Sequence, residues 1–134
     1  MPTFTKYIQN EEHYSEVISR IAKVHNTLWI GTADIKDVYV KQDGESMPLL
    51  GQLAALLKRG VGVRLIHAKE PGPNFREDFD RFPGLWDGLQ RRLCPRVHFK
   101  LLVFDCSLAY IGSANLTGAG MGMKGDGNRN FEAG

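Results

Sequence analysis

Residues 98–115 read HFKLLVFDCSLAYIGSAN. Residues 96–104 are rich in aliphatic and aromatic side chains and predict a β-strand with His98 near its middle. Residues 105–107, Asp-Cys-Ser, predict a turn, and residues 108–112 predict a returning strand. This stretch therefore predicts a β-hairpin in the C-terminal third of the chain.

Upstream of this hairpin, helical and strand patterns alternate along the chain. Apolar residues at helical spacing predict a helix over residues 11–24, with Asn10 as its N-cap, and a β-branched run predicts a strand over 27–33. A second helix is expected over 48–59 and a second strand over 61–67. This alternation predicts an α/β fold with a mixed, largely parallel sheet flanked by helices.

The remaining segments carry weaker patterns: a polar connection over 34–46, a proline-rich loop over 68–74, short helices over 75–93 broken at Pro83-Gly84, and a glycine-rich loop after Asn115. The final residues, NFEAG at 130–134, predict the beginning of a strand. We therefore expect a chain that is truncated at its C-terminus.

The composition is that of one ordered globular domain, residues 1–134. Hydrophobic residues make up 43% and charged residues 24% of the 134 residues, which argues against a disordered chain. No apolar run approaches the roughly 20 residues needed to cross a bilayer, and the N-terminus has no run of signal-peptide length. We expect a cytoplasmic protein without stable membrane insertion. Its two cysteines, Cys94 and Cys106, are interpreted as free thiols.

Basic residues are concentrated in one segment, although the net charge is only +2. Residues 89–104 contain four basic residues and no acidic one: Arg91, Arg92, Arg96 and Lys100. A local excess of positive charge in a nearly neutral chain favours an anionic ligand. The three arginines are therefore candidate substrate-binding residues.

Four side chains of residues 98–115 form a candidate phosphate site. Residues two apart on a strand point to one face, roughly 6.6–6.8 Å apart, so His98 and Lys100 project side by side. The hairpin folds Ser113 and Asn115 back toward them. An imidazole, an ammonium group, a hydroxyl and an amide can surround a phosphate, whereas they provide no carboxylate cage for a metal ion.

The spacing H-x-K-x4-D-x6-G-S-x-N resembles the signature of the phospholipase D superfamily. It is formed by His98, Lys100, Asp105, Gly112, Ser113 and Asn115. A glutamate follows this signature in the family at the start of a later strand, and Glu132 fits that place. The resemblance covers most of the chain and is sharpest over residues 96–132. The single motif and the loop over residues 116–129 resemble those of small bacterial stand-alone members. The resemblance implies the phospholipase D/nuclease fold.

The resemblance implies phosphodiester cleavage through a covalent phosphohistidine, with no metal and no other cofactor. His98 would attack phosphorus, while a second His98 would protonate the leaving oxygen and then activate water. Lys100 and Asn115 would bind the non-bridging oxygens, where charge builds up in the transition state.

Supporting roles are expected for the other motif residues. Ser113 would form hydrogen bonds within the site, and Glu132 would hold the other ring nitrogen of His98. Asp105 and Gly112 are expected to be structural, with Asp105 bonding to its own backbone in the turn.

This mechanism needs two copies of the histidine, and the chain has one motif. We therefore expect a homodimer that shares one active site across a two-fold axis. Of the other histidines, His13 and His25 are interpreted as ordinary surface or core residues. A site role is left open for His67, which closes a predicted strand at the edge of the sheet where α/β sites gather.

The sequence leaves three functions open. The basic residues favour an endonuclease acting on DNA or RNA. The second possibility is a phospholipase D or phosphatidyl transferase, in which exposed Met121, Met123 and Phe131 would contact lipid. The third is a non-catalytic phosphate-binding module of a larger protein.

Overall fold

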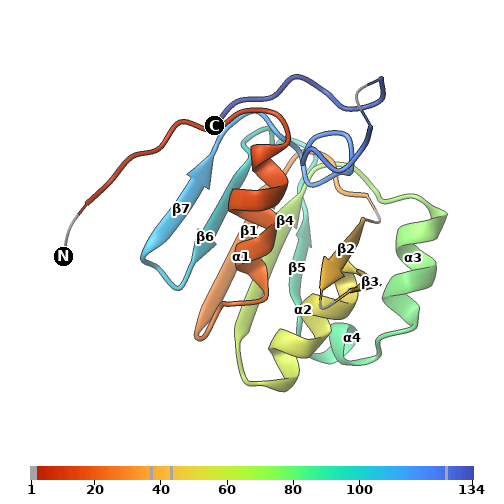
Figure 1. Ribbon diagram of the computed structural model, residues 1–134. Helices are drawn as coiled ribbons and strands as arrows, with labels where there is room; N and C mark the ends of the chain where they lie inside the picture. The colour runs from red at the N-terminus through yellow and green to blue at the C-terminus, as the bar shows by residue number, and fades with distance from the viewer. Residues whose placement is uncertain (1–2, 37, 43, 126) are drawn as a thin grey trace.

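The computed structural model describes residues 3–36, 38–42, 44–125 and 127–134, and Figure 1 shows how they are arranged. The helical segments are η1 (His13–Ile18), which is a π-helix, α1 (Ser19–Ile21), α2 (Leu49–Lys58), α3 (Pro73–Asp80) and α4 (Gly84–Gly88). The strands are β1 (Thr27–Thr32), β2 (Tyr39–Gln42), β3 (Glu45–Pro48), β4 (Gly62–His67), β5 (Gln90–Leu93), β6 (Leu101–Phe104) and β7 (Leu108–Ile111). None of the described helices has the length and hydrophobicity needed to cross a membrane.

A mixed five-stranded sheet organises the fold, in the order β5-β4-β1-β6-β7. Strands β5, β4 and β1 run parallel, β6 pairs with β1 in the antiparallel sense, and β7 returns beside β6. The predicted α/β fold and the predicted hairpin are confirmed. Strands β2 and β3 form a separate antiparallel pair.

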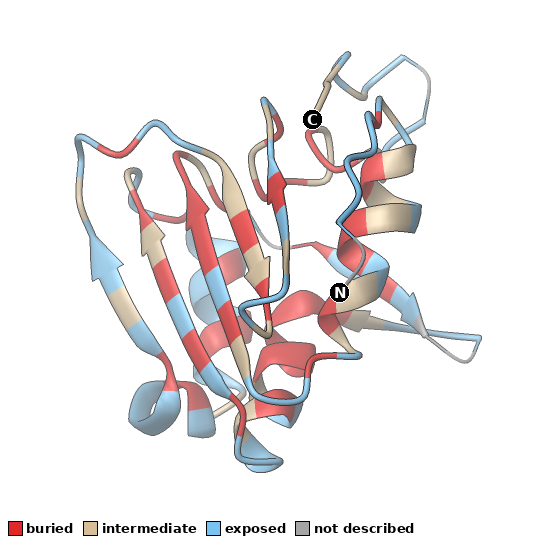
Figure 2. Cartoon of the chain, turned by 90° about the vertical axis from the view of Figure 1, so that its left-hand side faces the viewer, coloured by how far each residue is buried: buried red, intermediate tan, exposed pale blue. Residues whose placement is uncertain are grey.

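Alternation along the strands gives the sheet two different faces. On β1, Leu28 and Ile30 are buried in one hydrophobic core with the apolar side chains of the helices, whereas Trp29 between them is 41% exposed. Figure 2 shows the same alternation of buried and exposed residues along several strands. Burying a large aliphatic side chain contributes about 1.5–3 kcal/mol, so the face toward the helices carries most of the stabilisation. The helices in the described part of the chain pack on that face, and the other face is open.

Three local expectations are corrected. The predicted connection over 34–46 contains strand β2 and the start of β3, with residues 37 and 43 outside the described residues. The segment expected to hold only short helices also supplies β5, which pairs with β4. The hairpin strand begins at Leu101 rather than at residue 96, because β1, its ladder partner, pairs only as far as Gly31.

The predicted N-cap at Asn10 is also wrong. The first helical segment begins at His13 without a side-chain cap, and Asn10 has a positive φ of 49°. The Asn10 side-chain Oδ1 instead accepts the N–H of Glu132 at 3.1 Å. The predicted C-terminal end of the second helix is confirmed: α2 ends at Lys58, and Gly60 just after it has a φ of +88°, which ends the helix. Asn10 thus ties the segment before η1 to the C-terminal residues, and Figure 1 shows these two segments side by side.

Candidate active site

The two halves of the motif meet at the carboxyl end of β1. The register pairs Leu101 with Gly31 of β1 and with Ile111 of β7. The N–H of Gly112 donates to the carbonyl of Lys100 at 3.3 Å, which extends the hairpin past Leu101. The segment that carries His98 and Lys100 is therefore held beside the segment that begins at Gly112.

His98 is an exposed side chain next to a cation. It lies just before β6, and the Nζ of Lys100 is 3.4 Å from both ring nitrogens. An imidazole sealed in the core could not reach a substrate, whereas this ring is open to solvent. The predicted juxtaposition of His98 and Lys100 is present, although neither residue lies within β6 itself.

The amide of Asn115 is oriented by the end of β1. Its Oδ1 accepts the N–H of Asp34 at 3.1 Å, and because a backbone N–H can only donate, the other amide atom is Nδ2. Among the described residues Nδ2 has no hydrogen-bond partner. The amide can therefore present two N–H donors to an anion, which is the chemistry expected of this position.

Thr32 is a positioning residue that the sequence reading missed. Its buried hydroxyl donates to the Asp34 carbonyl at 2.6 Å and accepts the N–H of Leu116 at 3.0 Å. These two bonds fix the backbone on both sides of the Asn115 amide. The available signal was a hydroxyl residue at the carboxyl end of a parallel strand, where α/β sites form.

Ser113 and Glu132 contact each other directly. The Ser113 hydroxyl donates to Glu132 Oε2 and accepts the N–H of Ala133 at 3.0 Å. The expected contact between Glu132 and His98 is not found: no hydrogen bond among the described residues joins them. The carboxylate of Glu132 is held by the serine instead, because the chain from 132 to 134 packs against the exit of β7.

Gly112 has a structural role that depends on its missing side chain. A Cβ at this position would collide with the Ala133 carbonyl and the Tyr110 hydroxyl. The N–H of Ser113 donates to the same Ala133 carbonyl at 2.9 Å, so this close approach is part of the structure. Glycine is required here for space and not for a positive φ, which accounts for its place in the motif.

Asp105 does not bond to its own turn, and this expectation is corrected. Its carboxylate accepts the N–H groups of His25 (3.1 Å), Asn26 (2.6 Å) and Thr27 (3.0 Å). These backbone hydrogen bonds lower the pKa of Asp105, and the bond from the Asn26 N–H has the largest effect. The carboxylate holds the residues that lead into β1, because the turn has positive φ at Asp105 and Cys106 and directs the side chain toward them.

A buried pair supports the backbone between the two halves of the motif. His13 Nδ1 lies 2.8 Å from the Asn10 carbonyl and must donate to it, so its Nε2 accepts the Tyr110 hydroxyl at 2.9 Å. The same hydroxyl accepts the N–H of Ala114 at 3.3 Å, and burial raises the pKa of Tyr110. His13 is a core residue with a structural role, while His25 lies on the surface.

His67 is fully buried, so it cannot touch a substrate directly. Its Nδ1 donates to the Lys69 carbonyl at 2.9 Å, which leaves Nε2 to accept Arg91 Nη1 at 3.1 Å. Desolvation is the main reason that the pKa of His67 is lowered. The site role left open for His67 is not supported by these contacts, which instead orient Arg91.

The three candidate arginines do not act as one group. Arg91 turns toward the helices, where its guanidinium carbon lies 5.5 Å from the centroid of the Phe79 ring. Arg92 is exposed on the open face of the sheet, and Arg96 is exposed in the turn before Val97. Arg92 and Arg96 are therefore accessible to an anionic ligand, whereas Arg91 is half-buried.

Two further expectations concern the thiols and the glycine-rich loop. Cys106 is exposed and Cys94 is half-buried, both as free thiols.

Among the described residues, no group of three His, Cys, Asp or Glu side chains lies close enough to hold a metal ion. Met121 is buried in the core rather than on the surface, and Met123 is half-buried, so of these three residues only Phe131, at 92% exposure, can contact another surface.

A scan of protein families matches residues 17–134 to a family described as cardiolipin synthase, PLD-like domain. A comparison with curated proteins gives no match.

Solved structures with a similar fold include two that nearly span this chain. One is a phospholipase D family member, Nuc from Salmonella typhimurium, with a TM-score of 0.62 and 19% identity, covering 96% of this chain and 78% of Nuc. The other is NucT from Helicobacter pylori, with a TM-score of 0.62 and 13% identity, covering 96% of this chain and 83% of NucT.

A third structure shares the fold within a longer chain. It is TrmBL2, described as an archaeal chromatin protein with a novel mode of DNA binding. The TM-score is 0.60 at 12% identity, and the match covers 96% of this chain and 43% of TrmBL2. At these identities the three structures show a shared fold, which agrees with the architecture described above.

Proposed function

This chain belongs to the phospholipase D superfamily, and we propose that it is a metal-independent endonuclease that works through a covalent phosphohistidine on His98. Membership makes it a phosphodiester hydrolase. The observation that carries the finer proposal is the exposed His98 ring with Lys100 Nζ at 3.4 Å. A nucleophile and a fixed cation side by side are what attack on an anionic diester requires.

In the first step a neutral ring nitrogen of His98 attacks phosphorus. A P–N bond forms, the bond from phosphorus to the leaving oxygen breaks, and His98 of the partner subunit gives its proton to that oxygen. Lys100 and the Nδ2 group of Asn115 donate hydrogen bonds to the non-bridging oxygens. These donors act where negative charge accumulates, so they lower the barrier more than they strengthen substrate binding.

In the second step water releases the phosphate. His98 of the partner subunit, now neutral, takes a proton from water, the water oxygen attacks phosphorus, and the P–N bond breaks. Both imidazoles return to their starting states, and one water has been consumed. Ser113 holds Glu132 at the rim of this site and so stabilises the loop that ends beside Asn10.

Nucleic acid is the proposed substrate because of the accessible positive charge near the site. Arg96 lies two residues before His98, and Arg92 lies on the neighbouring open face of the sheet. Backbone phosphates bind such residues without base specificity. The proposal therefore predicts binding that weakens as salt is added.

Two protomers are needed because the proposed mechanism uses two imidazoles and the chain has one motif. A two-fold axis would bring His98 and His98 of the partner subunit to opposite sides of one phosphate. The exposure of His98 supports this arrangement, since a second protomer can approach it.

The test uses bis(p-nitrophenyl) phosphate, single-stranded DNA and RNA, and an alkaline denaturing quench with a labelled diester. Alkali is needed because phosphohistidine hydrolyses in acid. We expect cleavage that persists in EDTA, label on His98, and a loss of more than about 10³-fold in kcat for His98→Ala. Full activity of His98→Ala, or activity without any labelled histidine, would contradict the proposal; His25→Ala is the matched surface control.

A second candidate function has one observation in its favour, the description of the matching family as a cardiolipin synthase domain. In this alternative the same site transfers a phosphatidyl group, and the exposed Phe131 contacts the lipid surface. Vesicles that contain phosphatidylglycerol separate the two functions. Turnover of lipid without cleavage of DNA or RNA would favour the transferase.

A further inference from the structure

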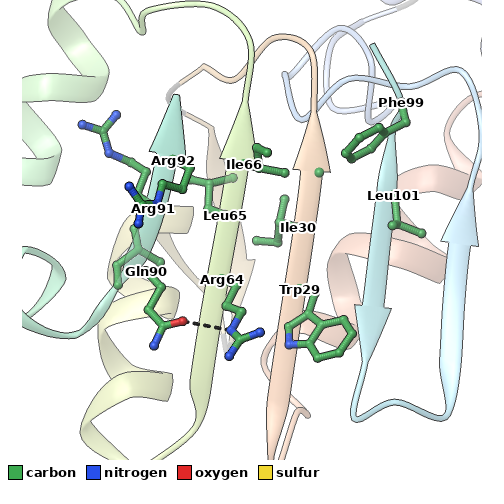
Figure 3. A pocket seen from close by; sticks show the side chains of 12 residues that line it. Trp29, Ile30, Arg64, Leu65, Ile66, Gln90, Arg91, Arg92, Phe99 and Leu101 are labelled. Atoms are coloured by element: carbon green, nitrogen blue, oxygen red, sulfur yellow. Dashed lines mark hydrogen bonds between the residues drawn. The ribbon is translucent and has the colours of Figure 1, made fainter. Parts of the chain in front are cut away.

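The open face of the sheet has a groove of about 650 Å³ that the proposed chemistry does not use. It runs over β5, β4, β1 and the segment that enters β6, and Figure 3 shows the residues that line it. Of these, Trp29, Arg64, Ile66, Arg92, Phe99 and Leu101 face away from the helices. Its floor is apolar and includes Ile66 and Leu101, and the rings of Trp29 and Phe99 also line it. The strand residues that face this side include Arg64 and Arg92 and no acidic side chain.

Two aromatic rings on this face are accessible. Trp29 is 41% exposed and Phe99 is 52% exposed. Phe99 lies over Gly31, where a Cβ would collide with its ring, so the glycine is what lets the ring lie on the sheet. Trp29 and Gly31 are two residues apart on β1, roughly 6.6–6.8 Å along the strand. The two rings therefore follow one another along β1.

Arginine side chains stand next to these rings. The guanidinium carbon of Arg64 lies 5.7 Å from the centroid of the Trp29 ring, and its Nε donates to Gln90 at 2.9 Å. Arg92 is exposed on the same face, beside Ile66 in the register. Positive charge beside exposed rings is complementary to a ligand with flat aromatic groups and negative charges.

Single-stranded nucleic acid has that chemistry. Its unpaired bases stack on aromatic side chains of an open sheet, and its phosphates bind arginine. In a duplex the bases are paired and stacked on one another, so they are not available to stack on the rings of Trp29 and Phe99. A second copy of this chain placed face to face would bring the arginines of both copies together, which is unfavourable.

The groove also adjoins the site. Phe99 is the residue between His98 and Lys100, so its ring points to the opposite side of the extended segment, and a strand bound on Phe99 would reach the proposed nucleophile by passing over the carboxyl end of the sheet. We propose that the open face binds a single-stranded segment of DNA or RNA, with bases on Trp29 and Phe99 and phosphates at Arg64 and Arg92, and presents the following diester to His98. This inference rests on the proposed function and specifies its substrate as single-stranded.

The test measures binding in a protein that cannot cleave. In His98→Ala combined with Trp86→Phe, Trp29 is the one remaining tryptophan, since the chain has two. Titration with (dT)12 and (rU)12 in EDTA is expected to quench its fluorescence to saturation. Arg64→Gln, Arg92→Gln and Phe99→Leu should each weaken binding at least fivefold, while Arg76→Gln, on α3 and paired with Glu70, should not.

Two binding results would overturn the inference: no saturable quenching of Trp29 fluorescence, or equal affinity for a duplex of the same length. A third is Trp29 quenching that increases with protein concentration in the absence of oligonucleotide, because it would mean that a second copy of the chain covers the open face. Gly31→Ala adds an independent check, because it displaces the Phe99 ring without removing it and should weaken binding. Gly62→Ala is the control, because a Cβ there would meet only the Asn26 carbonyl at 3.9 Å and Thr27 Cγ2 at 4.0 Å, which are ordinary van der Waals contacts. Binding does not depend on turnover. Failure of bis(p-nitrophenyl) phosphate hydrolysis would therefore refute the proposed function, and failure of the titration would refute only the groove.

Discussion

The Ser113 hydroxyl donates a hydrogen bond to the Glu132 carboxylate, and it also accepts the N–H of Ala133. One side chain thus connects the motif over residues 98–115 to a segment 19 residues further along the chain. Glu132 is held from its other side by Asn10, near the N-terminus. The rim of the candidate site is therefore assembled from three distant parts of the sequence.

Ser113→Ala should loosen this rim. It removes the donor to Glu132 and the acceptor for the Ala133 N–H, so we expect a loss of about 1 kcal/mol in the free energy of unfolding. The kcat for bis(p-nitrophenyl) phosphate should fall as well, because residues 132–134 at the rim of the candidate site are no longer fixed by Ser113. Urea unfolding and steady-state kinetics measure the two effects. Ser107→Ala, outside the site, is the control, and an equal loss of activity in that variant would contradict the assignment.

Thr32→Val tests the positioning of Asn115. The change keeps the shape of the side chain but leaves the Leu116 N–H and the Asp34 carbonyl without their buried partner. We expect a cost of about 1–3 kcal/mol in unfolding free energy and a fall in kcat. Thr27→Val, on the same strand but on the other face, is the matched control. Retention of full activity in Thr32→Val would show that the orientation of the Asn115 amide does not depend on the Thr32 hydroxyl.

Asp105→Asn should change how stability responds to pH. Hydrogen bonds from Asn26, His25 and Thr27 lower the pKa of Asp105 in the folded state. Its contribution is therefore complete above the unfolded pKa of about 3.9, and is lost as the pH falls through the lower folded value. The wild type should exceed Asp105→Asn in stability at neutral pH, and the difference should shrink below about pH 4. Urea unfolding at several pH values measures this, and a difference that is independent of pH would count against it.

His67→Gln should make the protein less sensitive to mild acid. Burial lowers the pKa of His67 in the folded state, so between that value and the unfolded pKa of about 6.5 the unfolded chain binds more protons. The contribution of neutral His67 to stability is therefore fully present above about pH 6.5, and it is lost as the pH decreases through the pKa of His67 in the folded state. Thermal unfolding from pH 8 to pH 5 should show a steeper decline for the wild type than for His67→Gln. Parallel curves would show that His67 does not titrate in this range.

Dimerisation should be visible both in mass and in activity. Light scattering of an active preparation should give twice the 15.0 kDa chain mass. An excess of His98→Ala chains should lower the activity of the wild type, because mixed dimers lack one of the two imidazoles. Activity that is carried by a monomer, or that is unaffected by the added variant, would refute the shared site.

Local patterns in the sequence were enough for much of this protein. Alternating apolar residues identify β1, β4 and the β6–β7 hairpin, and helical periodicity identifies α2, because each pattern repeats within a few residues. The motif spacing brings His98 beside Lys100, since two residues on an extended segment share one side. Strand β5 was missed because QRRL has no apolar run, and its position depends on pairing with β4.

The sequence by itself determined the α/β fold, the family and the candidate site residues, because these depend on residue type and short spacing. Only the tertiary structure decided the partners of those side chains. Asp105 binds the backbone at residues 25–27, nearly 80 positions away, and Glu132 binds Ser113 rather than His98. Such contacts form when separate elements pack in three dimensions, and no local pattern encodes which groups then meet. The same is true of the Phe99 ring over Gly31, which exists because β6 pairs with β1.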